Sequence, residues 1–207
     1  MSPGYTLHRD VLSPAIVRSY LASLASRGFR DMVGVRNLVA LVPETLSLLT
    51  PEVLILAGPG ATLVRATLFD KPPRARWSVP WHQDVVVPVS ERLPGHSAFT
   101  QKGGVLHARA PREVLERMIT VRLHLDECGL ESGPVRALPG THTLGVLLAG
   151  RISALAATVT PEVCLVPAGG AMVMRPLLVH SSGTAQDPSR HRRVVHLEFA
   201  GAQSTGL

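Results

Sequence analysis

The chain has 207 residues, of which 45% are hydrophobic and 17% are charged, a globular composition long enough for one domain with a substantial core. We expect no membrane segment, because no apolar run approaches the roughly 20 residues that cross a bilayer, and no signal peptide at the N-terminus. The net charge of +6 comes from scattered basic residues, so we expect no nucleic-acid binding. Two cysteines, Cys128 and Cys164, make no disulfide framework and favour a reduced, cytoplasmic location.

The first sixty residues favour helices. Ser13 and Pro14 provide a cap and a first-turn proline for an apolar stripe that Gly28 ends, and Thr50 and Pro51 repeat this start signal. The sequence therefore predicts at least two helices before residue 60.

After residue 60, short apolar segments alternate with turn residues. This pattern predicts strands at 61–69, 81–89, 118–126, 134–138, 162–166, 171–180 and 192–200. A further helix is expected at 144–156. We therefore predict a single domain over 1–207 that is mainly β with flanking helices, with a helical part at about 1–60 and a β-sandwich or barrel core at about 61–200.

The segment Pro80–Val89, PWHQDVVVPV, places ionisable side chains at the start of an apolar run. Because side chains alternate along a strand, His82 and Asp84 are predicted to share one face and Gln83 to point to the other. A buried carboxylate is usually paired or bound to a metal. A metal site, a salt bridge and a solvated strand end are the three interpretations.

A second apolar segment, Met174–His180, ends in a histidine 96 residues after Asp84. His-x-Asp on one strand and a distant His on another form the ligand set of the facial triad that binds Fe(II) and leaves positions open for a cosubstrate and oxygen. We therefore identify His82, Asp84 and His180 as candidate catalytic residues and metal ligands.

Arg192 follows twelve residues after His180. An iron enzyme that uses 2-oxoglutarate must hold the far carboxylate of this diacid, and a guanidinium fork matches a carboxylate. Ser182 could add a hydroxyl donor. The alternative interpretation is a solvated basic turn that leads into an edge strand.

Several motifs together resemble the phytanoyl-CoA dioxygenase family of Fe(II)/2-oxoglutarate oxygenases, in the family's order and over roughly residues 5–200. They are Leu68–Pro73, Trp81–Asp84, Gly133–His142, Pro167–Gly170, Pro176–Gly183 and Arg192–Val194. The resemblance implies a double-stranded β-helix (a jelly roll, cupin-like). It also implies that His82, Asp84 and His180 bind iron, and that Arg192 binds 2-oxoglutarate.

The resemblance extends to further cosubstrate contacts. Thr67 and Arg122 fall where the family contacts the cosubstrate, and Gln83 lies within the matched metal motif. Arg36 matches an early basic contact. The loop after His180 is one residue longer than in familiar members, so Arg190 or Arg193 could replace Arg192 in its role.

Three further histidines are interpreted as structural. His142 lies in a Pro-Gly turn motif, and His124 and His196 alternate with apolar residues along strands. Arg122, Arg136 and the Arg74/Arg76 pair hint at an anionic or polar substrate group.

The function implied is hydroxylation of a small-molecule substrate by Fe(II), 2-oxoglutarate and O2, with release of succinate and CO2. The alternatives are a cupin-like hydrolase or isomerase that uses the three ligands with another metal and no 2-oxoglutarate, and a binding module without chemistry. Residues 90–112, rich in glycine and with weak periodicity, are predicted to form a mobile flap over the site.

Overall fold

The structure is a computed structural model, and it describes residues 2–29, 34–73, 77–187 and 189–201. The secondary-structure elements, in chain order, are β1 (Tyr5–His8), α1 (Pro14–Ser26), β2 (Gly34–Val35), α2 (Leu38–Leu41), η1 (Pro43–Leu48), α3 (Pro51–Ala57), β3 (Thr62–Lys71), β4 (Val79–His82), β5 (Val86–Pro88), β6 (Ser97–Lys102), β7 (Val105–Arg109), α4 (Arg112–Arg117), β8 (Ile119–His124), η2 (Leu130–Ser132), β9 (Val135–Ala137), η3 (Thr141–Leu144), α5 (Ala149–Thr158), β10 (Glu162–Cys164), β11 (Ala171–Met174), β12 (His180–Ser182) and β13 (Arg192–Ala200).

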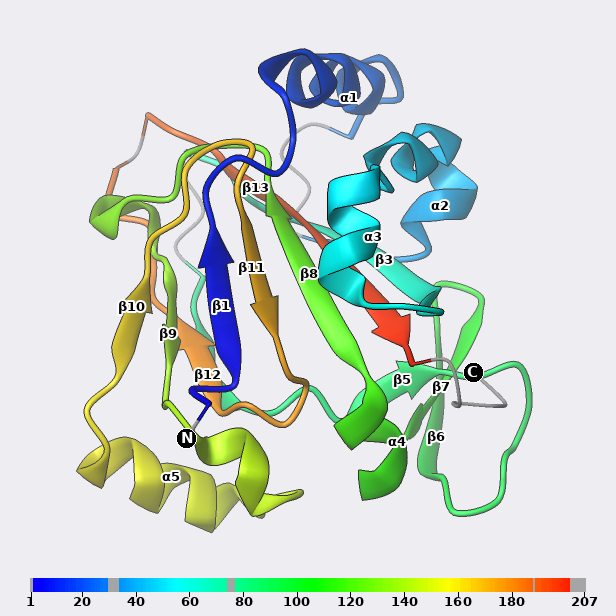
Figure 1. Ribbon diagram of the computed structural model, residues 1–207, viewed down its shortest axis with the longest axis vertical. Coiled ribbons are helices and arrows are strands. Elements are labelled where there is room, and N and C mark those ends of the chain that lie inside the picture. Colours follow the sequence, from blue (N-terminus) through cyan, green and yellow to red (C-terminus); the bar gives the residue numbers. More distant parts are fainter. Residues whose placement is uncertain (1, 30–33, 74–76, 188, 202–207) are drawn as a thin grey trace.

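The strands form three antiparallel sheets. The largest has the order β1-β11-β8-β13-β3-β2, the second β10-β9-β12-β4 and the third β5-β7-β6. Sequence-distant strands are neighbours in both larger sheets, which is the connectivity of a double-stranded β-helix. The predicted fold class, mainly β with flanking helices, is confirmed (Figure 1).

The N-terminal helices lie beside the large sheet, near β8 and β3 (Figure 1). Both expected start signals are present, because the Ser13 hydroxyl accepts from the Ile16 amide at 3.3 Å and the Thr50 hydroxyl accepts from the Val53 amide at 3.4 Å. Apolar residues of α1, α3 and the sheet share one buried core. The N-terminal part, for which only helices were expected, also contributes β1 and β2 to the large sheet.

Two predicted strands are each divided in two. The segment 81–89 gives the end of β4 and all of β5, and Gln83, Asp84 and Val85 connect them. The segment 171–180 gives β11 and the first residue of β12, with a turn between them that is closed by a hydrogen bond from the Leu178 amide to the Arg175 carbonyl at 3.0 Å. The breaks lie at the polar residues Gln83 and Asp84 and at Arg175.

The region 90–112 is not the irregular loop that was expected. It contains β6 and β7, joined by Gly103 and Gly104 with φ values of 59° and 76°. Two consecutive residues with positive φ form the hairpin turn that matches strand twist, and glycine adopts it without strain. Pairing of β7 with β5 fixes this hairpin beside the metal segment. Its motion as a lid stays a prediction.

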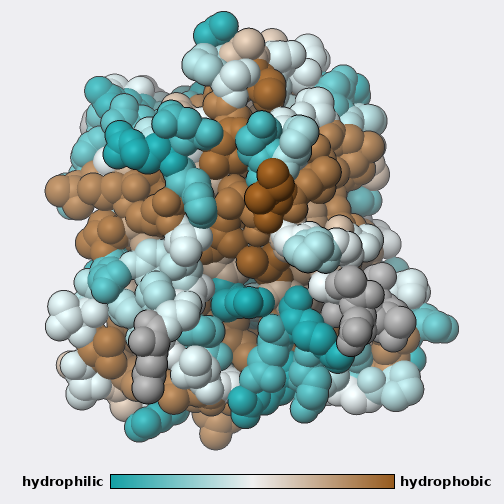
Figure 2. All heavy atoms as spheres, in the orientation of Figure 1, coloured by the Kyte–Doolittle hydropathy of each residue, from teal (hydrophilic) through white to brown (hydrophobic). Residues whose placement is uncertain are grey.

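The face of the molecule in Figure 2 carries apolar side chains over β1, β11 and α3. The large apolar residues exposed on these elements include Leu7, Leu54 and Ile55. In the described part of the chain, no helix is both long and apolar enough to cross a membrane.

Candidate metal centre and cosubstrate pocket

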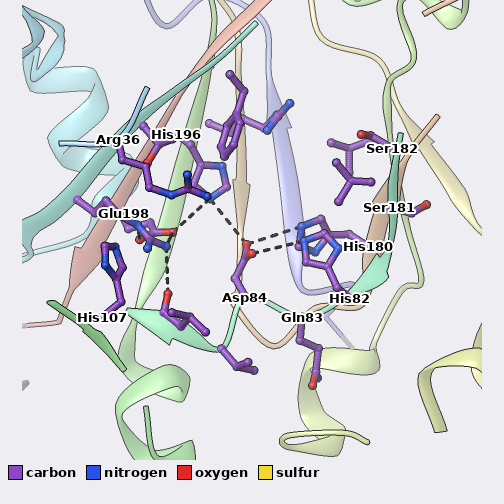
Figure 3. Close-up of a pocket in the computed structure, with 18 of the residues that line it drawn as sticks. Arg36, His82, Gln83, Asp84, His107, His180, Ser181, Ser182, His196 and Glu198 are labelled. Atoms are coloured by element: carbon purple, nitrogen blue, oxygen red, sulfur yellow. Dashed lines mark hydrogen bonds and ion pairs between the residues drawn. The ribbon is translucent and has the colours of Figure 1, made fainter. Parts of the chain in front are cut away.

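The three predicted ligands converge between the two larger sheets. His82 is the last residue of β4, His180 is the first residue of β12, and they are register partners. Asp84 lies just beyond β4, with its carboxylate 3.5 Å from His82 Nε2 and 3.7 Å from His180 Nε2. One ligand atom from each residue lies within 4.8 Å of the other two, a spacing that one metal ion can span. Figure 3 shows both imidazoles directed at the carboxylate.

The segment Gln83–Asp84, which follows the end of β4, is fixed by hydrogen bonds to the backbone of other segments. The Asp84 amide donates to the Pro176 carbonyl at 2.9 Å. The Gln83 side-chain amide donates to the carbonyls of Gly145 (2.9 Å) and Leu177 (2.7 Å), and its oxygen accepts from the Leu147 amide (2.8 Å).

Gln83 therefore has a different position from the one expected of a cosubstrate contact. Its side chain is buried and points away from the carboxylate of Asp84 (Figure 3). Both of its amide hydrogens are used by backbone carbonyls. This geometry supports a structural role, in which Gln83 fixes the segment that carries Asp84.

The two histidines are held in the tautomer that a metal requires. His82 Nδ1 lies 2.8 Å from the Pro80 carbonyl, and His180 Nδ1 lies 2.9 Å from the Leu178 carbonyl. A carbonyl only accepts, so each Nδ1 carries a hydrogen, and in the neutral form of each ring the lone pair is on Nε2. The two Nε2 atoms are those that face Asp84.

The protonation states also suit a cation. Burial raises the pKa of Asp84, but the charges and hydrogen bonds of His180, His82 and His196 outweigh it and hold the pKa well below its usual value. Burial lowers the pKa of His180 to about 4 despite the opposing charge of Asp84. One Asp84 oxygen, Oδ2, is buried without a hydrogen-bond partner among the described residues. An ionised carboxylate with an unpaired oxygen beside a neutral imidazole fits a metal ion.

The ligands lie in the wall of a cavity of about 340 Å³. The cavity is lined by Arg36, Arg65, Thr67, Phe69, Trp77, Val79, His82, Gln83, Asp84, Val85, Val86, Lys102, His107, Arg122, Val135, His180, Ser181, Ser182, Arg192, His196 and Glu198. All five predicted cosubstrate residues belong to this lining and so surround the same space as the metal ligands: Thr67, Gln83, Arg122, Ser182 and Arg192.

Two arginines of the lining are buried without ion-pair partners among the described residues. Arg192 is 1% exposed and Arg122 is 7% exposed. Arg192 Nε and one terminal nitrogen, and Arg122 Nε, have no hydrogen-bond acceptor there. Burial lowers the pKa of Arg122 to about 9, and the charge of Arg192 adds to this effect. Two buried cations in one cavity wall, without an ion-pair partner among the described residues, form a site for an anion.

Lys71, which the sequence analysis did not select as a site residue, belongs to the same positive region. It is the register partner of Arg192 and is fully buried. Its ammonium donates to the Ser182 hydroxyl at 3.3 Å and to the Gly183 carbonyl. Burial, together with the charges of Arg192 and Arg122, lowers the pKa of Lys71 to about 7.

The three candidate arginines at the end of the chain have different surroundings. Arg192 lines the cavity. Arg193 points the other way and donates from its backbone amide and its guanidinium to Asp126, at 2.7–2.8 Å. Arg190 lies 3.4 Å from Asp187 and is mostly exposed. Only Arg192 of the three is placed to reach a ligand beside His180.

The remaining histidines differ in location. His142 lies in η3 and is not part of the metal-ligand cluster. His196 lines the cavity, and its Nε2 lies 3.7 Å from Asp84 and 3.6 Å from Glu198. His124 is buried on β8 and does not line the cavity.

The cavity wall also contains an ion pair, between Arg65 and Glu198, that was not predicted from the sequence. Arg65 and Glu198 are register partners on β3 and β13, with guanidinium and carboxylate atoms 2.5 Å apart. Glu198 is buried, and burial raises its pKa to about 7 against the lowering effect of Arg65.

Comparison with known proteins identifies the family. The profile of phytanoyl-CoA dioxygenase (PhyH) matches residues 48–194. The chain belongs to the phytanoyl-CoA dioxygenase family. The sequence resemblance to this family of Fe(II)/2-oxoglutarate oxygenases is thereby confirmed. No curated protein sequence gives a significant match.

Solved structures share the phytanoyl-CoA dioxygenase fold. AviO1 from Streptomyces viridochromogenes Tue57 has 21% identity and a TM-score of 0.69, over 98% of this chain and 91% of that chain. The non-heme alpha ketoglutarate dependent epimerase SnoN from nogalamycin biosynthesis has 18% identity and a TM-score of 0.72, over 97% and 79%. HygX from Streptomyces hygroscopicus, solved with nickel and 2-oxoglutarate bound, has 14% identity and a TM-score of 0.68, over 98% and 84%.

Proposed function

We propose that this protein is an Fe(II)- and 2-oxoglutarate-dependent dioxygenase that hydroxylates a small-molecule substrate. In this reaction 2-oxoglutarate loses CO2 and becomes succinate, one atom of O2 enters succinate and the other enters a C–H bond of the substrate as a hydroxyl group. Family membership supports the oxygenase class. Hydroxylation is the finer part of the proposal, because SnoN, which shares the fold, is an epimerase.

The observation that carries the proposal is the position of the unpaired arginines. Arg192 and Arg122 line the same cavity as His82, Asp84 and His180, and both are buried without a carboxylate partner among the described residues. A hydrolase or isomerase that used the three ligands alone would leave two buried cations uncompensated, at a cost of several kcal/mol per ion. A dianionic cosubstrate bound beside the metal supplies the missing charge.

The residues of the cavity would bind the metal and the cosubstrate. His82 Nε2, Asp84 and His180 Nε2 hold the metal. The guanidinium of Arg192 pairs with the C5 carboxylate of 2-oxoglutarate in a planar fork. Ser182 and Thr67 provide hydroxyl groups, and Arg122 adds a second positive charge in the same wall.

Bound iron would supply the activation of O2, with electrons from the oxidative decarboxylation of 2-oxoglutarate and from the substrate. The protein provides binding and orientation. Asp84 stays ionised and His180 stays neutral at neutral pH, so neither has to lose a proton before the metal binds.

The proposal is tested by succinate formation. Purified protein is incubated aerobically with 2-oxoglutarate and Fe(II), without added substrate, and succinate is measured by mass spectrometry against a metal-free sample. Slow formation that needs both Fe(II) and O2 and is lost in His180→Ala is expected. Absence of succinate together with hydrolysis or isomerisation of a test compound by the zinc or manganese form would overturn the proposal in favour of the hydrolase or isomerase.

A further inference from the structure

Four basic side chains from separate elements line the cavity on the side of Asp84 away from Ser182. Arg36 follows β2, Arg65 is on β3, Lys102 ends β6 and His107 is on β7. In Figure 3 the labelled Arg36 and His107 lie on the Glu198 side of Asp84, whereas Ser181 and Ser182 lie beyond His180. In this basic cluster, Arg36 and His107 therefore lie on the other side of Asp84 from Ser182, one of the residues assigned to the cosubstrate.

The charges of the basic cluster are not balanced by the cavity wall. Apart from Asp84, the one carboxylate in the described lining is Glu198. Both of its oxygens are engaged by Arg65, at 2.5 Å each. Arg36 and Lys102 have no carboxylate within ion-pair distance in the described part of the chain. Both side chains are exposed and line the cavity, so their charges are available to a ligand.

His107 is the buried member of the basic cluster. His107 is 2% exposed, and its Nδ1 donates to the Val105 carbonyl at 2.9 Å. Burial lowers the pKa of His107, and the charges of Arg65, Arg36 and Lys102 lower it further. His107, Arg36, Arg65 and Lys102 all belong to the lining of this one cavity.

The lining of the cavity also contains apolar side chains. Val85 and Val86 follow Asp84 directly and line the cavity together with Phe69. We expect a molecule whose anionic group binds Arg36 and Lys102 to contact these apolar residues with the rest of its surface, in the same cavity as Asp84.

We infer that the substrate is a small molecule that carries an oxyanion group, a carboxylate or a phosphate ester, which Arg36 and Lys102 bind at the hairpin side of the cavity. This inference names the substrate class of the proposed oxygenase and rests on that function for the chemistry. Arg65 belongs to the wall rather than to the anion site, because its guanidinium is paired with Glu198.

The residues that suggested an anionic substrate from sequence lie elsewhere. Arg122 is in the cosubstrate wall, Arg136 stacks over Trp81, with its guanidinium 5.2 Å from the ring, and Arg74 and Arg76 fall outside the described residues.

A matched pair of probes tests the inference. Benzoate and benzamide have nearly the same shape and differ in charge. Their dissociation constants are measured by ligand-observed NMR on the full chain loaded with Ni(II) and saturating 2-oxoglutarate, so that Arg122 and Arg192 are already occupied. Benzoate should bind roughly tenfold more tightly than benzamide, as expected for charge-assisted contacts. The preference should shrink as salt is raised, because both cations are exposed.

The variants assign the preference to the cluster. In the double variant Arg36→Gln/Lys102→Gln the two probes should bind within about twofold of each other. Arg151→Gln, which removes an exposed arginine on α5 outside the cavity, should keep the wild-type preference. Equal binding of the probes to wild type, absence of benzoate binding, or a preference that survives in the double variant would each overturn the inference.

A parallel series without metal or 2-oxoglutarate separates this inference from the proposed function. If the oxygenase proposal fails, 2-oxoglutarate does not bind, yet the Arg36→Gln/Lys102→Gln pair still lowers the benzoate preference more than Arg192→Ala does. If the inference fails, 2-oxoglutarate still binds normally to every one of these variants except Arg192→Ala. The Arg36→Gln/Lys102→Gln substitutions then leave the preference for benzoate over benzamide unchanged.

Discussion

His82 and His180 face each other as register partners of β4 and β12, with ring centroids 4.2 Å apart and each Nδ1 fixed by a backbone carbonyl. Cross-strand pairing therefore brings together two residues that are 98 positions apart and presents both Nε2 lone pairs to Asp84. A metal would meet a preformed set of ligands, which needs little rearrangement on binding.

His82→Ala, Asp84→Ala and His180→Ala should each abolish stoichiometric Fe(II) binding, because each removes one of three protein ligands. Calorimetric titration of the anaerobic protein with Fe(II) gives the affinity. His142→Ala serves as the control and should bind iron like wild type, since His142 lies in η3 apart from the ligand cluster. Wild-type affinity in any of the first three variants would remove that residue from the metal site.

Arg192→Ala should weaken 2-oxoglutarate binding about 10- to 150-fold, the equivalent of a charge-assisted hydrogen bond of about 1.5–3 kcal/mol. Metal affinity should stay nearly unchanged. Arg192→Lys should recover part of the loss, because an ammonium cannot form the planar fork. Arg193→Ala is the matched control. It breaks the contacts with Asp126 and should reduce stability rather than cosubstrate affinity.

Gln83→Ala should lower the free energy of unfolding by about 1–3 kcal/mol, because it leaves the carbonyls of Gly145 and Leu177 and the Leu147 amide without their buried partner. Denaturant unfolding measures this change. Gln101→Ala, at an exposed position of β6, should change it by less than about 0.5 kcal/mol. A large loss of 2-oxoglutarate affinity without a loss of stability would instead restore Gln83 as a cosubstrate contact.

The sequence was informative where a local pattern determines the outcome. Because side chains alternate along a strand, the segment 192–200 predicts that Arg192, Val194, His196 and Glu198 share one face. Arg192, His196 and Glu198 line the cavity, and Val194 is buried outside its lining. Alternation also placed His82 and Asp84 together, but the strand ends at His82. Their proximity depends instead on hydrogen bonds from the Gln83–Asp84 segment to distant backbone, which no local pattern encodes.

Of the basic cluster, only Arg36 was identified from sequence, for a related reason. Lys102 reaches the cavity because the Gly103–Gly104 turn folds β6 back onto β7, and β7 pairs with β5 next to Asp84. The weak periodicity of 90–112 concealed this hairpin. Lys71 stood in a recognised motif, but its place beside Arg192 follows from the register of β3 and β13.

Binding of 2-oxoglutarate should be accompanied by proton uptake above pH 7. In the free protein the pKa of Lys71 is about 7, so the ammonium is increasingly neutral as the pH rises above that value. A dianion beside Arg192 and Arg122 favours the charged form and raises this pKa, so the complex holds more protons and affinity falls with increasing pH. Calorimetry at pH 8 in buffers of different ionisation enthalpy measures the uptake. Lys71→Met should eliminate it, whereas unchanged uptake in that variant would assign the proton to another group.

The most direct test of an Fe(II)/2-oxoglutarate centre at this site is an anaerobic titration of the Fe(II)-loaded protein with 2-oxoglutarate, followed by visible absorption. Chelation of the iron by the 2-oxo acid should give a charge-transfer band that saturates at one equivalent. The half-saturation point should move to higher 2-oxoglutarate concentration in Arg192→Ala, and the band should be absent in His180→Ala. Iron binding without such a band in the wild-type protein, or an unchanged band in His180→Ala, would contradict the assignment.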